Sequence, residues 1–191
     1  WPAFRCDQLW NWLYVRRVAR WDAMTNLPRA MREGLAGEFR IDAATTDESA
    51  SLLAADGTRR LLARLTDGDS VEEVLIPARG RNTVCVSTQV GCRFNCAFCA
   101  SGQAGFRRHL AAGEIVGEVL LASAAFGARP SHVVFMGIGE PLDNYDEVIR
   151  AVRILNDGDG LAIGARRLTL STCGVVPGIR RLAGEGLQIE L

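Results

Sequence analysis

The sequence predicts an α/β protein: a partial (β/α) barrel, preceded by a small helical N-terminal domain and a short antiparallel β meander. Three observations support this fold class. Apolar residues first recur at helical spacing, closely spaced turn signals follow, and strand-like and helix-like segments then alternate. The predicted divisions are residues 1–44 for the helical accessory domain, 45–82 for the β extension and 83–191 for the barrel portion.

The first predicted element is a helical region over residues 4–41. Leu27, Met31 and Leu35 recur at helical spacing, and Pro28 suits the first turn of a helix. We interpret the tryptophans of this region as packing residues rather than a ligand box, because buried aromatic side chains mostly pack.

The next predicted element is an antiparallel meander. Turn signals recur at Asp56-Gly57, Asp67-Gly68-Asp69 and Arg79-Gly80-Arg81. Short apolar or alternating runs lie between them, including Val71–Ile76 and Thr83–Thr88. Such spacing is typical of strands joined by hairpins.

Strands and helices then alternate. The predicted strands are 83–88, 133–136 and 168–171, with the start of another at 187–191, and the predicted helices are 112–126, 145–155 and 176–183. Repeated β-α units imply a parallel sheet, which can close into a barrel. The run stops at its fourth strand, which leaves a bare sheet edge, so we expect the remaining part of the barrel to lie beyond Leu191.

Composition restricts the function classes. The chain has 191 residues, 48% of them apolar, which suffices for a sizeable core, and its net charge is zero. There is no global field to attract nucleic acid, so any RNA contact must come from local arginine clusters. No apolar run reaches membrane-spanning length and no signal peptide is visible. We therefore expect a monomer in a reducing cytoplasm, with no membrane partner.

Three of the six cysteines fall within eight residues, as Cys92, Cys96 and Cys99. Their spacing is C-x3-C-x2-C, on a loop after a predicted strand. Short loop spacings let several thiolates converge on one iron–sulfur cluster, and three ligands leave one iron open for a substrate. Structural zinc normally takes four ligands, and no fourth Cys or His follows at zinc spacing. Taken alone, the spacing leaves structural zinc and buried thiols as alternatives.

This segment, with Phe98 as its aromatic residue, resembles the C-x3-C-x-aromatic-C signature of the radical S-adenosylmethionine (SAM) superfamily. Other segments resemble the RlmN/Cfr family of RNA adenine methyltransferases, most closely its RlmN branch. They are residues 85–92, 100–110, 134–145 and 167–177, together with Pro2–Arg5 and Asp22–Leu27. The resemblance covers essentially the whole chain.

The resemblance implies the cofactors and the partners. Cys92, Cys96 and Cys99 would hold a [4Fe–4S] cluster whose open iron is chelated by SAM. Reductive cleavage of SAM, with an electron donor such as flavodoxin or ferredoxin, would give a 5′-deoxyadenosyl radical, and the protein would orient it. The implied reaction is methylation at C2 of an adenosine in 23S rRNA, with tRNA as a further substrate.

The resemblance also implies residues that contact SAM. Gly139 and Glu140, after the second barrel strand, match a SAM-contacting pair, and Ser171 matches a SAM-contacting serine. Taken alone, the glycines also suit a tight turn, and Ser171 also suits a cap for the following helix.

Two further residues receive catalytic roles from the resemblance. Cys85 would resolve a protein–RNA adduct by forming a disulfide, and Glu72 would remove the adenine proton. Taken alone, Cys85 is better explained as a buried core thiol. Adjacent acids in a strand face opposite ways, so one of the two could face the site, and the resemblance assigns that place to Glu72, with Glu73 as the surface partner. The alternative is that both acids are solvated.

The implied reaction uses two SAM molecules and a methylated cysteine of the C-terminal segment. We expect that cysteine beyond Leu191, and we expect residues 1–191 alone to be inactive in methyl transfer. The alternatives are C8 methylation by the same family, a non-catalytic iron–sulfur or zinc-binding fragment, and an RNA-binding decoy. Arg107 and Arg108 form a basic run, and His109 replaces the asparagine usual in the family. Cys6 and Cys173 receive no role.

Overall fold

The computed structural model describes residues 1–103 and 105–191, so Ala104, within one of the motifs quoted above, lies outside the described residues. The N-terminal region is helical, as predicted. Its elements are α1 (Phe4–Trp10), a π-helical turn η1 (Asn11–Val15), a 3-10 turn η2 (Trp21–Ala23) and α2 (Arg29–Glu38). The helical region is interrupted after η1, where Arg17 adopts a left-handed conformation with φ of 55°.

The N-terminal helices have a small core of their own. Trp12, Met24, Leu27 and Met31 are buried together. The indole N–H of Trp12 donates to the side-chain oxygen of Asn26, which satisfies its one polar atom. The interpretation of Trp12 as a packing residue is therefore confirmed.

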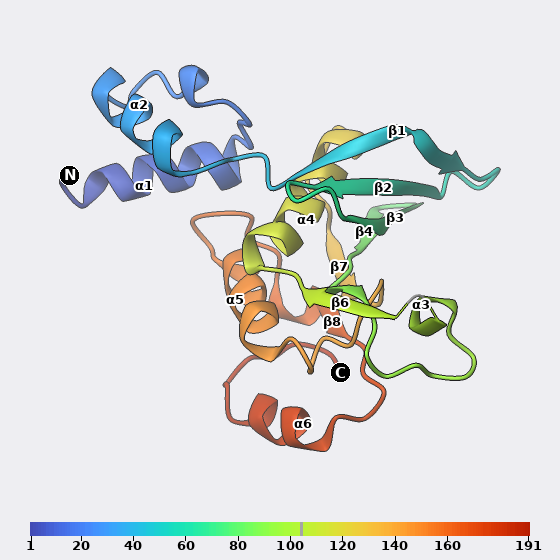
Figure 1. Cartoon of the computed structure of the whole chain (residues 1–191). Coiled ribbons are helices and arrows are strands. Elements are labelled where there is room, and N and C mark those ends of the chain that lie inside the picture. Colours follow the sequence, from blue (N-terminus) through green and yellow to red (C-terminus); the bar gives the residue numbers. More distant parts are fainter. Residues whose placement is uncertain (104) are drawn as a thin grey trace.

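One six-stranded mixed sheet runs through the rest of the chain, in the order β1-β2-β3-β4-β7-β8. Its strands are β1 (Ala44–Leu53), β2 (Arg59–Leu65), β3 (Ser70–Ala78), β4 (Arg81–Cys85), β7 (His132–Phe135) and β8 (Leu168–Leu170). The first four pair antiparallel, whereas β4, β7 and β8 pair parallel (Figure 1). Glu190 forms a further parallel bridge to Thr169 beyond β8. The predicted α/β class and the meander are confirmed, and the domain boundaries stay predictions.

Three longer helices follow the strands at the predicted places: α4 (Ala112–Phe126), α5 (Tyr145–Asn156) and α6 (Val176–Ala183). A 3-10 turn, η3 (Ala165–Arg167), precedes β8. The bounds of α4 have a local cause. The Glu114 carboxylate accepts the backbone N–H of Ala111 at 2.9 Å at the N-terminus, and Gly127, at φ of 64°, ends the helix in a left-handed conformation. Among the described residues, none of the helices is long and apolar enough to cross a membrane.

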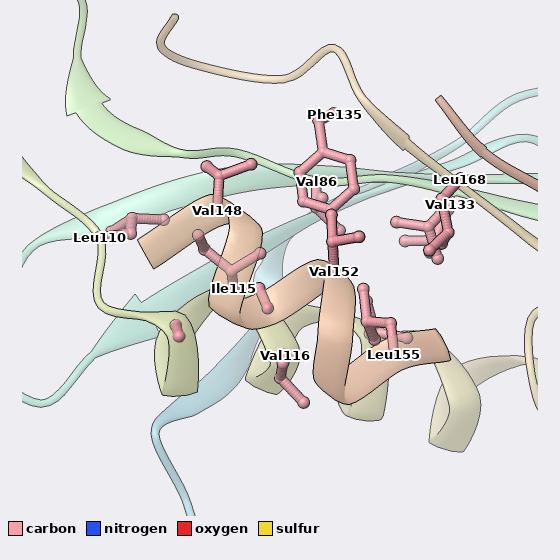
Figure 2. Packing of buried hydrophobic residues seen from close by; sticks show 14 of the residues in the cluster. Val86, Leu110, Ile115, Val116, Val133, Phe135, Val148, Val152, Leu155 and Leu168 are labelled. Atoms are coloured by element: carbon pink, nitrogen blue, oxygen red, sulfur yellow. The ribbon is translucent and has the colours of Figure 1, made fainter. Parts of the chain in front are cut away.

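The main core lies between one face of the sheet and helices α4 and α5 (Figure 2). Its fully buried strand residues include Val133, Phe135 and Leu168, which pack with residues such as Ile115 of α4 and Val152 of α5. Burying one such side chain stabilises the fold by about 1.5–3 kcal/mol. The side chains on the helix-facing side of the sheet therefore pack in this core, and those on the opposite side can make other contacts.

A second, two-stranded sheet was not predicted. It pairs β5 (Gln89–Gly91) with β6 (Phe106–His109), on either side of the short helix α3 (Ala100–Gln103). The N–H of Cys92 donates to the carbonyl of Gly105 at 3.0 Å and closes the neck of the loop between them. A Cβ on Gly91 would lie 1.7 Å from that carbonyl oxygen, so this position requires glycine.

Candidate functional site

The three clustered cysteines lie on the loop that leaves β5. Cys92, Cys96 and Cys99 are free and half-buried. The N–H of Cys99 donates to the carbonyl of Cys96 at 2.9 Å, which turns the chain tightly between them. A backbone N–H bond from Gly102 lowers the pKa of Cys99 and so favours its thiolate, the form that binds metals.

All three cysteines line one cavity of about 270 Å³. The other lining residues come from the cluster loop and from the ends of β7 and β8: Phe94, Phe98, Phe135, Met136, Gly137, Gly139, Glu140, Ser171, Thr172 and Cys173. Among the described residues, no three Cys, His, Asp or Glu side chains are arranged to hold a single metal ion. The donor set instead fits a multi-iron cluster, because each thiolate then binds a different iron around a shared cavity.

The loop after β7 approaches this cavity because glycine lets it pack against the segment after β4. The N–H of Gly137 donates to the carbonyl of Val86 at 3.0 Å. The carbonyl of Ile138 accepts from the N–H of Gln89 at 3.1 Å. Gly139 has φ of 108°, and a Cβ there would lie 2.7 Å from side-chain atoms of Gln89 and Thr88, so the close approach excludes larger residues.

Glu140 ends this loop and is almost fully buried at the cavity. Its carboxylate is oriented by two backbone donors, the N–H of Leu142 at 2.9 Å and the N–H of Cys173 at 2.7 Å. Two fixed donors compensate the charge and still leave lone pairs for a cationic ligand in the cavity. The structure therefore brings Glu140, as well as Gly139, next to the three cysteines.

Ser171 lies at the end of β8, exposed and on the cavity wall. The alternative, that it caps the following helix, is wrong: α6 has no side-chain cap. The hydroxyl of Thr172 instead accepts the N–H of Gly174 at 3.1 Å and turns the chain. A side chain on the cavity wall remains available to a ligand.

Cys173 was not predicted as a site residue, yet it lines the same cavity as the three cysteines. Desolvation raises the pKa of its thiol to about 12, and the hydrogen bond to the Glu140 carboxylate adds to the shift. A signal was present in the sequence, because Cys173 follows a barrel strand at the edge where α/β sites gather.

Glu72 and Cys85 lie on neighbouring strands and on the same face. Val74 pairs with Cys85 in the register of β3 and β4, and Glu72 is two residues from Val74. Burial raises the pKa of Cys85 to about 11, an N–H bond from Met136 opposes this shift, and the Glu118 charge adds to it. Cys85 is thus a protonated thiol at neutral pH. Neither Glu72 nor Cys85 lines the cavity that the three cysteines share.

The two adjacent acids differ from the prediction in one respect. Glu72 is half-exposed, and its Oε1 accepts from Nη1 of Arg60 at 2.7 Å. Glu73, predicted to be a surface partner, is instead fully buried. The reason is tertiary: Val71, Glu73 and Leu75 share the β3 face that packs against α4. The alternative that both acids are solvated is therefore wrong.

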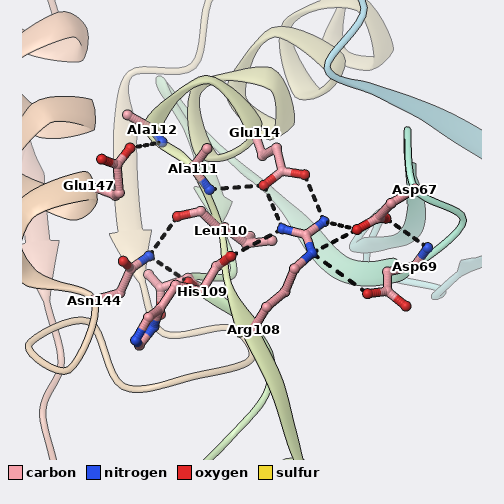
Figure 3. A network of polar contacts seen from close by, with 11 residues as sticks. Asp67, Asp69, Arg108, His109, Leu110, Ala111, Ala112, Glu114, Asn144 and Glu147 are labelled. Atoms are coloured by element: carbon pink, nitrogen blue, oxygen red, sulfur yellow. Dashed lines mark hydrogen bonds and ion pairs between the residues drawn. The ribbon is translucent and has the colours of Figure 1, made fainter.

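The basic run after the cluster loop is used within the fold (Figure 3). Arg108 donates through Nη1 and Nη2 to both oxygens of Glu114, at 2.8 Å each, and through Nε to Asp67 at 2.7 Å. The hydrogen bonds to Glu114 are the main cause that raises the pKa of Arg108 above its ordinary value, and the contact with Asp67 adds to this shift. Arg107 pairs with Asp69 at 2.9 Å. Both arginines connect β6 to the turn before β3, so both guanidinium groups are already paired with carboxylates of the protein.

Comparison with known proteins gives two matching families. Residues 86–189 match the radical SAM superfamily, and residues 2–41 match the ribosomal RNA large subunit methyltransferase N-terminal domain. The two matches cover the cluster region and the helical N-terminal region, respectively.

Individual relatives are similar over the whole chain. A probable dual-specificity RNA methyltransferase RlmN of Symbiobacterium thermophilum is 49% identical, over 100% of this chain and 52% of its own length. One of Geobacillus thermodenitrificans is 48% identical, over 98% and 52%. The crystal structure of a radical SAM methyltransferase from Sphaerobacter thermophilus superposes with a TM-score of 0.91 at 42% identity, over 98% of this chain and 56% of that one. The chain therefore spans about half the length of these relatives.

Proposed function

Because this chain belongs to the radical SAM superfamily and, within it, to the RlmN family, we propose that it is part of a radical SAM RNA methyltransferase. In this proposal the thiolates of Cys92, Cys96 and Cys99 are the ligands of a [4Fe–4S] cluster. When bound, the cluster and SAM supply a reactive organic radical, and the protein supplies binding, orientation and electrostatics.

One observation carries the proposal: the three thiols share a cavity with the loops that follow β7 and β8. These loops are far from the cysteines in the sequence and contribute Gly139, Glu140 and Ser171. A parallel sheet brings the carboxyl ends of its strands to one edge, where ligands bind in α/β folds. A metal-binding fragment without a cosubstrate would not need this second group of polar residues.

Each of these three residues, Gly139, Glu140 and Ser171, has a role in the proposal. The Glu140 carboxylate, held by two backbone N–H groups, accepts the charged amino group of SAM. Gly139 lets the backbone approach SAM closely, and the exposed hydroxyl of Ser171, which also lines the cavity, hydrogen-bonds SAM.

Glu72 and Cys85 act on the RNA in this proposal. Glu72 takes the proton from the adenine ring. Its carboxylate is paired with the guanidinium group of Arg60. Cys85 then resolves the protein–RNA adduct. Its raised pKa keeps the thiol protonated until a base takes its proton, which prevents premature disulfide formation.

The proposed substrate is C2 of an adenosine in 23S rRNA, with tRNA as a further substrate, and C8 of adenosine is the alternative. We propose an electron donor such as flavodoxin or ferredoxin and a monomer in the cytoplasm. None of the six cysteines of this chain is assigned as the methyl-carrying one. We therefore propose that residues 1–191 bind the cluster and SAM but do not transfer methyl groups alone.

Anaerobic reconstitution with iron and sulfide tests the cluster assignment. The wild type is expected to take up about four irons per chain. Cys96→Ala is expected to hold less than half of that iron and to lack the cubane signal in electron paramagnetic resonance. Cys6→Ala is the matched control, because Cys6 is an exposed free thiol on α1, and it should match the wild type.

The same samples test the cosubstrate. Reduction with dithionite in the presence of SAM is expected to yield 5′-deoxyadenosine and methionine. Unchanged iron in Cys96→Ala would reject the ligand assignment. Bound zinc without SAM cleavage would favour a non-catalytic metal-binding fragment, and turnover of 23S rRNA by residues 1–191 would disprove their inactivity.

A further inference from the structure

Two carboxyl groups lie buried between the sheet and helix α4. Glu73 of β3 and Glu118 of α4 are both fully buried. Within the described part of the chain, neither oxygen of Glu73 has a hydrogen-bond partner, and Oε1 of Glu118 has none. The proposed reaction uses neither residue.

Burying two acids together is costly, because each must lose its hydration and each repels the charge of the other. Burial raises the pKa of Glu73 to about 8. Burial first, and then the Glu73 charge, raises the pKa of Glu118 well above its ordinary value, and the N–H of Ser87 opposes this shift. An apolar residue at this position of α4 would avoid the cost of burying a carboxyl group. The presence of Glu118 therefore indicates that its side chain makes a specific contact.

That contact is the backbone of Ser87. Strand β4 ends at Cys85, and the N–H of Ser87 is not used by the neighbouring strands. A buried N–H without an acceptor is strongly unfavourable. Oε2 of Glu118 accepts this N–H at 2.9 Å and is its partner in the fold.

Ser87 in turn connects two parts of the proposed site. Its hydroxyl donates to the backbone carbonyl of Glu72 at 2.8 Å and accepts the N–H of Ile138 at 3.0 Å. Ile138 belongs to the loop that carries Gly139 and Glu140. A single side chain therefore joins the strand of the proposed base to the loop of the proposed SAM contacts.

We propose that Glu118 is a positioning residue, which acts through Ser87 to fix the Gly137–Glu140 loop relative to Glu72. The roles of the loop and of Glu72 rest on the proposed function, but the mechanical link does not. Glu73 lies against the same helix and makes no bond to Ser87, so it belongs to the core and has no positioning role.

Three variants separate these roles. Glu118→Gln keeps a carbonyl oxygen that can accept the Ser87 N–H, whereas Glu118→Leu removes the acceptor at similar volume. Glu73→Gln is the matched control, because it changes the other buried acid and leaves the Ser87 contact intact. Should Glu118→Leu not fold, Ser87→Ala removes the hydroxyl bonds to Glu72 and Ile138 directly.

Hydrogen exchange measured by mass spectrometry at constant pH, without SAM, reads out the link itself. In Glu118→Leu or Ser87→Ala, amide exchange in the peptide covering residues 134–142 is expected to rise about tenfold, the size of one lost hydrogen bond. Glu118→Gln and Glu73→Gln are expected to stay within about twofold of the wild type. Wild-type exchange in a folded Glu118→Leu would overturn the proposal, and so would wild-type exchange in Ser87→Ala or an equal increase in Glu73→Gln.

SAM binding by the reconstituted protein gives the functional readout. The dissociation constant is expected to rise about tenfold in Glu118→Leu at unchanged iron content, and to be restored in Glu118→Gln. A wild type that holds its cluster but binds no SAM would refute the proposed function. The exchange experiment would still decide whether Glu118 positions the loop, so the two failures are distinguishable.

Discussion

Glu72 and Glu73 are neighbours in the sequence but lie in opposite environments. The Glu72 side chain is 43% exposed and accepts a hydrogen bond from Arg60. Glu73 faces α4, is fully buried and has no hydrogen-bond partner in the described part of the chain. Because successive strand residues point to opposite faces, the pleat places Glu72 at the surface and Glu73 in the core, where burial raises the pKa of Glu73 to about 8.

The same division applies to the neighbouring elements. Cys85 shares the face of Glu72, whereas Glu118 of α4 lies with Glu73 behind the sheet. The open face thus carries the two residues that we propose to act on the RNA. On the helix face, Glu118 would act on the site only through Ser87, so identical side chains would take different roles on the two sides in our proposals.

Replacing each acid by its amide is expected to show the largest difference between Glu72 and Glu73. Glu72→Gln should slow methylation by about 100-fold or more, since general-base groups typically contribute factors of that size. Glu73→Gln should keep methylation within about threefold of the wild type. Single-turnover assays on 23S rRNA, with a chain that includes the methyl-carrying cysteine, measure both. Equal losses in the two variants would show that the faces do not divide the roles.

Cys85 is expected to react slowly although it lies on the open face. Its pKa of about 11, against an ordinary 9.0, reduces the thiolate fraction at pH 8 by roughly 100-fold. Alkylation by iodoacetamide in the metal-free protein, followed by mass spectrometry, should accelerate about tenfold per pH unit between pH 8 and 10. A rate that levels off near pH 9, as expected for a thiol with the ordinary pKa of 9.0, would contradict the raised pKa.

Glu73 is expected to make stability depend on pH. Its pKa is raised from 4.5 to about 8 in the folded chain, so the folded state keeps a proton that the unfolded state releases. The free energy of unfolding therefore falls as pH rises from about 4.5 through 8.

Glu73→Gln should reduce this dependence and stabilise the chain by about 1–2 kcal/mol at pH 8.5, because the amide removes the charge but still needs partners. Urea unfolding of both proteins at pH 5 and pH 8.5 measures the difference. Glu118 is the other buried acid in both proteins, and Glu73→Gln also removes the Glu73 charge that helps to raise the pKa of Glu118. An equal difference between the proteins at both pH values would contradict the prediction.

Much of the fold could be predicted from local pattern. Helix α4 was predicted at its observed bounds, because Ile115, Val119 and Ala122 form an apolar face. The parallel strands followed from their alternation with helices. The pairing of β5 with β6 could not be predicted, since strands of three and four residues carry too little periodicity.

The site was predictable where residues are adjacent in sequence and not where they meet in space. The spacing of Cys92, Cys96 and Cys99 was enough to predict a metal-binding loop, and the three thiols do line one cavity. Cys173 was missed because it joins that loop only when β8 pairs with β7. The burial of Glu73 was missed because it depends on which face of β3 the helix α4 covers.

The bond between Cys92 and Gly105 has an entropic consequence for cofactor assembly. A free loop loses conformational entropy when its ends meet and when its ligands gather, and this cost opposes metal binding. Here the ends are already joined by the β5–β6 pairing and by the tight contact at Gly91. If the loop binds a cluster as proposed, part of this ordering cost is already met by protein folding.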